Sequence, residues 1–324
     1  MKTIVLEKPG DFRLTEGPAP GSPAPREALV RIRRVGVCGS DIHAYKGNQP
    51  FFTYPRVVGH ELGVEIAAVG PNEKGLAVGD RCAVEPYLHC GRCIACRRGK
   101  TNCCVNLQVL GVHADGGMRE FMTVPIAKLH RSRRLSLDQL ALVEMLTIGA
   151  HAARRAQLDP GENVLVIGAG PIGLATTTFA QLSGARVSVL EISAWRREFC
   201  RQHLRVDRCL DGQGDTGKQL QELLDGDLPT TVFDATGSPK SMMQAVQYVP
   251  TAGSWCTSPW CRRTSRSPTR RCTAASWPCF AAGMPWPLTS CGPCRWWRTD
   301  ASTSARGSRT GRPRTRWSAS SRPG

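Results

Sequence analysis

The sequence predicts a two-domain α/β protein, in which a β-rich domain precedes a domain of alternating strands and helices around a parallel sheet. Short β-rich runs separated by turn residues fill residues 1–147, and strand and helix patterns alternate over residues 148–253. A cysteine cluster interrupts the first domain at residues 90–104. A chain of 324 residues is long enough for two domains of ordinary size. Residues 254–324 show neither pattern, so we expect the parallel sheet to be incomplete.

The β-rich domain opens with a strand over residues 3–6 and contains further strands such as 28–37 and 64–69. Gly-Pro at 70–71 and Gly-Asp at 79–80 are turn signals, as expected of a barrel-like domain. The charged N-terminal residues do not resemble a signal peptide, and no apolar stretch reaches the roughly 18 residues that a membrane span requires. We therefore expect a cytoplasmic protein whose cysteines stay reduced.

The second domain begins with a helix that is predicted over residues 137–156, where apolar residues recur at helical spacing. Beyond it, short apolar runs alternate with helical patterns, which is typical of a parallel sheet with helices on both faces. The predicted strands are 163–167, 186–190 and 231–234, and the predicted helices are 171–183 and 194–204.

Four cysteines with the spacing C-x2-C-x2-C-x7-C predict a structural zinc site in the first domain. Four thiolates surround a zinc ion tetrahedrally and leave no position for water, so such a site stabilises the fold and does not catalyse. Unpaired buried cysteines and disulfides are alternatives, but the regular spacing and a reducing compartment favour zinc. The neighbouring Cys103 is expected to be a spectator. The predicted ligands are Cys90, Cys93, Cys96 and Cys104.

A second group of metal-binding residue types lies upstream, in Cys38-Gly-Ser-Asp-Ile-His43 and Gly59-His60-Glu61. A thiolate and an imidazole are the usual partners of a zinc ion that keeps one position open for a substrate. Such an ion polarises an alcohol oxygen and lowers its pKa. Glu61 or Glu144 could be the third protein ligand, or could exchange with bound water. Cys38 and His60 taken singly fit ordinary buried residues, but their joint occurrence favours a metal.

The motif Gly168-Ala-Gly170-Pro-Ile-Gly173 directly follows a predicted strand and opens a helix. Gly168 allows a tight turn, Gly170 lets the backbone approach a pyrophosphate, and Gly173 permits close packing of the helix. Pro171 suits the first helical turn, beside Ile172, and the helix N-terminus faces the phosphate charge. In this strand-turn-helix context, the motif predicts a dinucleotide-binding site.

Glu191 ends the next predicted strand, 23 residues after Gly168. Its carboxylate can accept hydrogen bonds from a ribose hydroxyl and would repel a 2′-phosphate, so NAD is favoured over NADP. Arg196 and Arg197 leave NADP open, although they could flank the adenine or lie on a solvated helix face.

A third motif, Asp234-Ala235-Thr236-Gly237, follows another strand at the same edge of the sheet. The nicotinamide half of a dinucleotide would lie there. We expect Ala235 and Thr236 to contact the cofactor, although a plain strand-to-loop turn explains the motif equally well.

Together these motifs resemble the zinc-containing medium-chain dehydrogenase/reductase family, which includes alcohol, sorbitol and threonine dehydrogenases. The resemblance spans about residues 1–250 and implies a GroES-like catalytic domain followed by a Rossmann NAD-binding domain. It implies that Cys38 and His60 bind a catalytic zinc ion, with Glu61 or Glu144 as the third ligand. It also implies that hydride passes from a secondary alcohol to NAD.

The family resemblance further assigns Ser40 and His43 to a relay that carries the substrate's proton, through the nicotinamide ribose, to solvent. The stretch 110–121 is most similar to bacterial enzymes that act on sugar acids and polyols, such as L-galactonate-type oxidoreductases. Two departures from the family pattern are Gly63, one place early after the His-Glu pair, and Met145, where proline is frequent.

The net charge of +17 would normally suggest a nucleic-acid-binding protein, but its distribution disfavours that class. Thirteen arginines and a single acid, Asp300, follow Thr251, whereas the first 250 residues hold 30 basic and 25 acidic residues. A zinc ribbon that binds nucleic acid together with the arginine-rich tail therefore remains an alternative that the charge pattern disfavours.

Residues 254–324 hold seven of the eight tryptophans and do not continue the family pattern. Another reading frame of compatible codons gives ordinary protein sequence, such as Val-Val-Glu-Asp-Gly-Arg-Ile-Asp in place of residues 296–303. We hypothesise that the native frame is lost near residues 251–253, which would leave an inactive dehydrogenase remnant. Resequencing of the coding DNA tests this. Family members are expected to be homo-oligomers, which such a tail makes doubtful.

Overall fold

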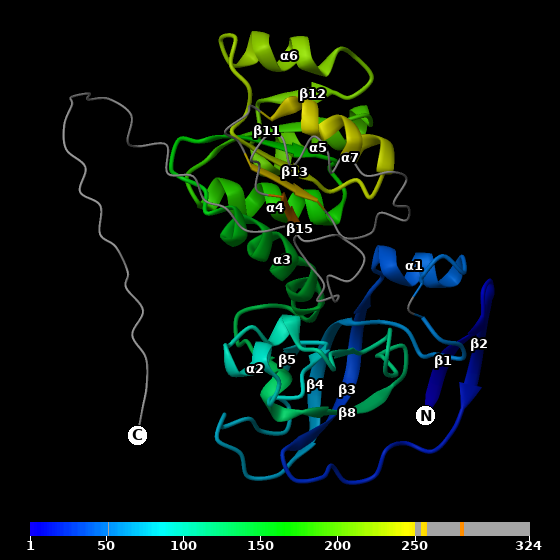
Figure 1. Ribbon diagram of the computed structural model, residues 1–324. Helices are drawn as coiled ribbons and strands as arrows, with labels where there is room; N and C mark the ends of the chain where they lie inside the picture. Colours follow the sequence, from blue (N-terminus) through cyan, green and yellow to red (C-terminus); the bar gives the residue numbers. More distant parts are fainter. Residues whose placement is uncertain (51, 250–253, 258–278, 282–324) are drawn as a thin grey trace, which may run out of the picture. The chain divides into compact units, whose positions relative to one another are not determined.

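Helix α3 (Leu137–Ala156) is a single continuous helix that leads from the β-rich domain into the parallel-sheet domain (Figure 1). The computed structural model describes residues 1–50, 52–249, 254–257 and 279–281. The helix begins with a capping box, in which Ser136 Oγ accepts the Gln139 amide and the Gln139 side chain accepts the Ser136 amide. The domain boundary predicted between residues 147 and 148 therefore falls inside a helix.

Glycines let α3 pack closely on both sides. A Cβ on Gly63 would lie 2.2 Å from the Leu137 carbonyl oxygen, and a Cβ on Gly149 would lie 2.4 Å from the Ala175 carbonyl carbon. Neither position can hold a larger residue without moving backbone. The early position of Gly63, a departure from the family pattern, thus has a local packing reason.

The β-rich domain is built on a five-stranded antiparallel sheet in the order β8-β3-β4-β5-β9. Alternate residues of its strands, such as Ala28 and Val30, are fully buried in one core with Val64 and Val124, which is the period of two that a half-buried strand requires. The elements of this domain are β1 (Lys2–Lys8), β2 (Asp11–Glu16), β3 (Glu27–Gly36), α1 (Gly39–Tyr45), β4 (Glu61–Val69), β5 (Arg81–Val84), β6 (Tyr87–Leu88), α2 (Ile94–Arg97), η1 (Thr101–Cys103), β7 (Gln108–Val109), β8 (Phe121–Pro125), η2 (Ile126–Lys128) and β9 (Leu129–Arg131).

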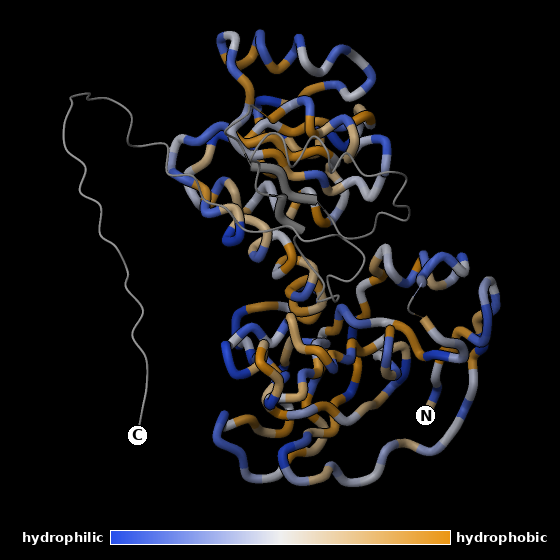
Figure 2. Tube along the Cα trace, in the orientation of Figure 1, coloured by the Kyte–Doolittle hydropathy of each residue, from blue (hydrophilic) through white to orange (hydrophobic). Residues whose placement is uncertain are grey.

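The second domain is a parallel sheet with helices on both faces. Val164 and Val166 of its central strand pack in a core that includes residues of α3, α4 and α5, whereas Leu165 and Ile167 pack on the other face with residues of α6 and α7. Figure 2 shows these strands as mainly hydrophobic. The elements are β10 (Asn163–Ile167), α4 (Pro171–Leu182), β11 (Arg186–Glu191), α5 (Ala194–Leu204), β12 (Cys209–Asp211), α6 (Thr216–Leu223), β13 (Thr231–Asp234), α7 (Pro239–Ala245), η3 (Val246–Tyr248), β14 (Ser254–Thr257) and β15 (Cys279–Ala281).

The parallel sheet has six strands in the order β12-β11-β10-β13-β14-β15, which is the strand order of a doubly wound dinucleotide-binding fold. The expectation of an incomplete sheet is therefore wrong for the described residues. β14 pairs with β13 over four residues, and β15 pairs with β14 over three. Strands pair through backbone hydrogen bonds, which do not depend on side-chain composition. The prediction relied on composition and therefore ended the sheet before β14 and β15.

Most of residues 254–324 lies outside the described residues, and so do the hypotheses that concern that segment. Within the part of the chain that the structure describes, no helix combines the length and apolar composition that would let it cross a lipid bilayer.

Candidate functional site

Cys38, His60 and Glu61 come together where α1 and β4 begin. Cys38 is the N-cap residue of α1, and His60 directly precedes β4, of which Glu61 is the first residue. One ligand atom of each lies within 4.8 Å of the other two. Gly36, paired with Glu61 across the sheet, leaves the room that this carboxylate occupies, because a Cβ there would lie 2.2 Å from Glu61 Oε2.

The charges around His60 fit a divalent cation. Burial opposes a charge on His60, but the Cys38 sulfur, Asp41 and Glu144 outweigh it and raise the pKa of His60 to about 10. Burial also raises the pKa of Glu61. The charges of Glu144 and Asp41 raise this pKa further, whereas His60 and Cys38 lower it. One imidazole thus lies among a thiol and three buried carboxyl groups. This donor set of sulfur, nitrogen and oxygen is one that zinc accepts, and a divalent ion would balance the negative charge.

Asp41, which the sequence analysis did not assign, is the nearest support of this group. Its Oδ1 lies 3.7 Å from His60 Nδ1, and its Oδ2 accepts the Cys38 amide at 3.0 Å. His60 Nδ1 has no hydrogen-bond partner within the described part of the chain. A carboxylate behind a ligating histidine fixes the ring and its tautomer. The signal was an acidic residue in the first turn of α1, three residues after Cys38.

The two residues of the predicted proton relay lie on α1. Ser40 is buried, and its Oγ lies 3.5 Å from His60 Nε2, whereas His43 is on the exposed side of the last turn. The structure thus places a hydroxyl beside the donor group and an imidazole toward solvent, three residues apart on α1, and the relay between them stays a prediction.

Glu144 lies on α3 and is buried, and its Oε1 accepts a hydrogen bond from the Tyr87 hydroxyl. Its charge acts on both His60 and Glu61, yet it is not a member of the three-residue group. Sequence reasoning named Glu144 and missed Tyr87, because the two residues are 57 positions apart and no local pattern joins them.

The four-cysteine group also assembles. The sulfurs of Cys90, Cys93, Cys96 and Cys104 lie within 4.8 Å of one another, and those of Cys93 and Cys96 are 3.5 Å apart. Sulfurs on a tetrahedron around zinc are separated by about 3.8 Å, whereas a disulfide requires about 2.05 Å. All four are free thiols, and Cys103 is exposed and outside the group.

Backbone amides prepare this lobe for thiolates. The amides of Cys96 and Val105 lower the pKa of Cys93 to about 6, and those of Arg92 and Cys93 lower the pKa of Cys90. The Cys90 amide donates to Cys104 Sγ at 3.3 Å. Burial and the neighbouring Cys93 and Cys104 sulfurs instead raise the pKa of Cys96. A donor set of four clustered thiols, two of them stabilised as thiolates by N–H groups, fits zinc that is closed to substrate.

The glycine motif forms the predicted turn between β10 and α4. Gly168 has a φ of 93°, in the left-handed region that favours glycine. A Cβ on Gly173 would lie 1.8 Å from the Gly168 carbonyl oxygen, so the helix can start here only with glycine at that position. Gly170 is the N-cap residue, and a Cβ there would meet no described atom within 4 Å. With Pro171 at the first helical position, the loop leaves open space at a helix N-terminus, which fits a pyrophosphate.

Glu191 ends β11 next to this loop. Its Oε2 accepts the Ala169 amide at 2.7 Å and its Oε1 accepts the Ser193 amide at 2.9 Å. Arg196 Nη1 lies 3.9 Å from Glu191 Oε2. Arg197 instead forms a two-pronged ion pair with Asp211, so it serves the packing of α5 on β12.

Ala235 and Thr236 lie beside the glycine loop at the end of β13. The Ala235 amide donates to the Ile167 carbonyl oxygen, and Thr236 Cγ2 would lie 3.0 Å from a Cβ on Gly168. The Thr236 amide and hydroxyl both donate to Asp234 Oδ1, and Ser241 donates to Oδ2. The motif thus forms an ordered turn at the edge where the sheet carries the glycine loop.

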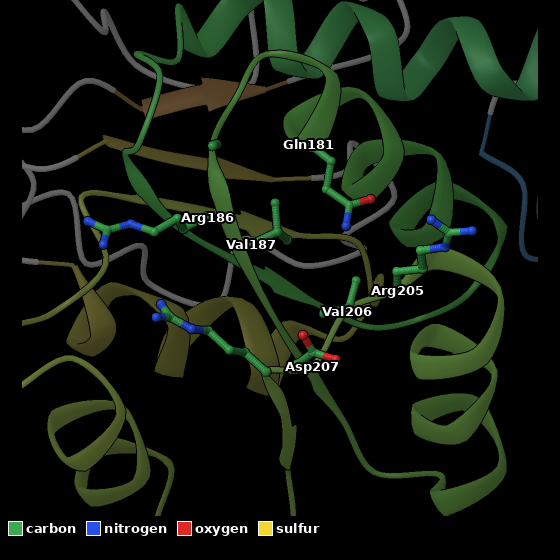
Figure 3. Close-up of a pocket in the computed structure, with 8 residues that line it drawn as sticks. Gln181, Arg186, Val187, Arg205, Val206 and Asp207 are labelled. Atoms are coloured by element: carbon green, nitrogen blue, oxygen red, sulfur yellow. The ribbon is translucent and has the colours of Figure 1, made fainter.

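An open depression of about 260 Å³ lies elsewhere on the parallel-sheet domain (Figure 3). It is formed where β11 begins and just before β12, at the opposite end of the sheet from the glycine loop. In Figure 3 the side chains of Arg186 and Arg205 extend away from each other, so their charges do not converge. The depression is therefore not a candidate for the active site.

Known proteins similar in sequence or structure share the two-domain arrangement in which these residue groups lie. The sequence matches the model of the alcohol dehydrogenase GroES-like domain over residues 24–134, and that of the zinc-binding dehydrogenase domain over residues 171–260. L-galactonate-5-dehydrogenase of Escherichia coli K12 is 42% identical over 251 residues, which are 77% of this chain and 73% of the relative. Sorbitol dehydrogenase of Arabidopsis thaliana is 34% identical over 246 residues, 72% of this chain and 67% of the relative.

The solved structure of the RspB alcohol dehydrogenase from Escherichia coli CFT073 in complex with NADH matches with a TM-score of 0.80 and 32% identity, over 88% of this chain and 83% of that one. The resemblance seen in the motifs is confirmed, with a GroES-like domain and a Rossmann-like domain in the order expected. The chain belongs to the family of zinc-dependent, NAD(P)-linked alcohol and polyol dehydrogenases, and is an oxidoreductase of that family.

Proposed function

We propose that this chain oxidises a secondary alcohol group of a polyol or sugar acid and transfers the hydride to NAD. The observation that carries the proposal is the group of Cys38, His60 and Glu61, which offers three donor atoms to one ion and leaves a fourth position for a substrate hydroxyl. A closed four-thiolate site and a dinucleotide loop elsewhere in the same chain fit this role.

Cys38, His60 and Glu61 would hold the catalytic zinc ion, and Cys90, Cys93, Cys96 and Cys104 the structural one. When bound, the catalytic ion supplies positive charge that lowers the pKa of the substrate hydroxyl. Ser40, beside the donor group, and His43, on the exposed side of α1, would carry the substrate's proton away to solvent. Asp41 lies 3.7 Å from His60 Nδ1 and favours the tautomer with its proton on that nitrogen.

The glycine loop and Glu191 bind the cofactor. Gly170 allows the pyrophosphate close to the backbone, and the N-terminus of α4 stabilises its charge. The Glu191 carboxylate, already fixed by the Ala169 and Ser193 amides, accepts the ribose hydroxyls and repels a 2′-phosphate. Arg196 is close enough to weaken that repulsion, so the preference for NAD is expected to be moderate.

The substrate class rests on similarity. Relatives named for L-galactonate and for sorbitol oxidation, at 42% and 34% identity, both act on polyhydroxylated compounds by their names. Polyols and sugar acids are therefore the compounds to test as substrates.

The test measures NADH formation by the purified full-length chain with each alcohol of the panel, in parallel with NAD and NADP. We expect oxidation of at least one sugar acid or polyol, with kcat/KM roughly tenfold higher for NAD than for NADP. The Glu191→Ala variant should lose most of this preference, since a single charge interaction of about 1.4 kcal/mol corresponds to tenfold. Absence of NADH formation with every alcohol, in a protein that carries two zinc ions, would contradict the proposal.

A further inference from the structure

Tyr87 and Glu144 form a hydrogen-bonded pair beside the proposed catalytic zinc site. Tyr87 is the first residue of β6, where it pairs with Val109 of β7, and its hydroxyl donates to Glu144 Oε1 on α3. Burial first, and then the charges of Glu144 and Cys38, raise the pKa of Tyr87 well above its ordinary value. The phenol therefore stays a donor throughout the physiological pH range.

Glu144 occupies an unusual position for a carboxylate so near a metal site. It is buried and interacts electrostatically with His60 and Glu61. Among the described residues, however, the ligand atoms that lie within 4.8 Å of one another are those of Cys38, His60 and Glu61, without Glu144. A free carboxylate at this place would be attracted to a divalent cation bound by these three residues, so the contacts of Glu144 bear on the coordination of that ion.

The hydrogen bond from Tyr87 is one such contact. Hydrogen bonds from a neutral donor to a carboxylate are among the stronger ones in proteins. One carboxylate oxygen is engaged by the phenol, which turns the group toward β6. Glu144 thus has two possible partners, the phenol that it contacts in the structure and a cation held by Cys38, His60 and Glu61.

We propose that Tyr87 is a positioning residue, whose phenol keeps the Glu144 carboxylate out of the zinc coordination sphere and so leaves the fourth position open for the substrate hydroxyl. This inference rests on the proposed function, because it requires zinc at Cys38, His60 and Glu61. It goes beyond that function by assigning a role to a residue outside the donor set. Loss of the phenol would let Glu144 bind the cation in competition with the substrate.

The test compares Tyr87→Phe with Tyr54→Phe in the full-length protein loaded with Co²⁺ or Zn²⁺. Tyr54 is a matched control, because its partly buried hydroxyl also donates one hydrogen bond, to the Ala44 carbonyl oxygen. The spectrum of the Cys38→Ser variant is subtracted from each cobalt spectrum, which removes the contribution of the four-cysteine lobe. Thermal unfolding of each variant verifies that it is folded.

In Tyr87→Phe, the cobalt d–d bands should lose intensity, because an added carboxylate oxygen raises the coordination number. Release of zinc to a chelator should slow roughly tenfold, and KM for the alcohol should rise roughly tenfold with a smaller change in kcat, as loss of one charge-assisted hydrogen bond implies. Tyr54→Phe should change none of these. A merely structural role of Tyr87 would lower stability without altering the cobalt spectrum.

A double-mutant cycle tests whether the effect of Tyr87 passes through Glu144. If it does, Tyr87→Phe should have no further effect on the cobalt spectrum or on KM in a Glu144→Gln background. Additive effects of the two substitutions, or identical behaviour of Tyr87→Phe and Tyr54→Phe, would overturn the inference. Failure of the proposed function looks different, since the wild-type protein would then show no cobalt signal beyond that of the Cys38→Ser variant.

Discussion

The two metal-binding groups of this protein are held in opposite ways. The four-cysteine lobe takes all its ligands from a stretch of 15 residues, and backbone amides donate to its sulfurs. The group of Cys38, His60 and Glu61 combines two separate segments and is surrounded by carboxyl groups from α1 and α3. A closed site needs a loop of the right spacing, whereas an open site needs side chains that hold the donors without filling the last position.

The largest expected effect comes from substitution of a ligand in the open group, Cys38, His60 and Glu61. Cys38→Ser should remove the catalytic metal and lower kcat/KM by roughly 10³-fold, because several kcal/mol of charge stabilisation are lost. Metal analysis should find one zinc ion per chain instead of two, with the four-cysteine lobe still filled. Retention of both ions and of activity would break the comparison between the groups.

Substitution of a ligand in the closed group, the four-cysteine lobe, should lower stability and leave the catalytic step unchanged. Cys93→Ser should empty the lobe and lower the thermal unfolding midpoint by roughly 5 °C or more, because structural zinc contributes folding energy directly. Cys103→Ser is the matched control, since Cys103 is exposed and outside the group. An equal fall in stability for both variants would contradict a zinc-filled lobe.

Asp41→Asn should weaken zinc binding at the open group alone. Loss of the carboxylate behind His60 is expected to lower the zinc affinity of this group by roughly 10–100-fold, without changing that of the four-cysteine lobe. Competition with a chromogenic chelator measures both affinities. Asp138→Asn, on the exposed first turn of α3, provides the control and should leave both unchanged.

The smallest effect concerns Glu85, on the stretch that leads from β5 to Tyr87 and the lobe. Burial opposes its ionisation, but hydrogen bonds from His130 and Lys128 outweigh burial and lower the pKa of Glu85 to about 2, from an ordinary value of 4.5. Because the folded pKa is depressed, its contribution to stability is complete above about pH 4.5 and is lost as the pH falls toward 2.

Urea unfolding of the wild-type protein and of Glu85→Gln measures this contribution. The difference between them should be about 1 kcal/mol at neutral pH, given the partial exposure of the pair. It should shrink steadily below pH 4.5. A difference that stays constant over this range would show that the charge of Glu85 plays no part.

Much of the fold could be predicted because its signals are local. The predicted bounds of the helix at 137–156 and of the strands at 163–167 and 231–234 match α3, β10 and β13, since capping residues and buried apolar runs mark them directly. The short helices α1, α6 and α7 were not predicted, because seven or eight residues carry little periodicity. Pairing of β14 and β15 depends on contacts distant in sequence, which composition does not report.

The candidate site shows the same limit. Cys38, His60, Glu61 and the glycine loop follow from motifs whose residue types carry the chemistry. Tyr87 could not be found in this way, because its role depends on the packing of β6 against α3 and not on any local spacing.

The continuous helix α3 imposes a further constraint that concerns rotation. It carries Glu144 toward the metal group and, five residues later, Gly149 against α4. Each residue turns an α-helix by about 100°, so one residue inserted between these positions would swing one contact to another face of the helix. The direction of both contacts therefore depends on the number of residues between positions 144 and 149. An insertion of one residue, which a surface loop would tolerate, would break one of these two contacts.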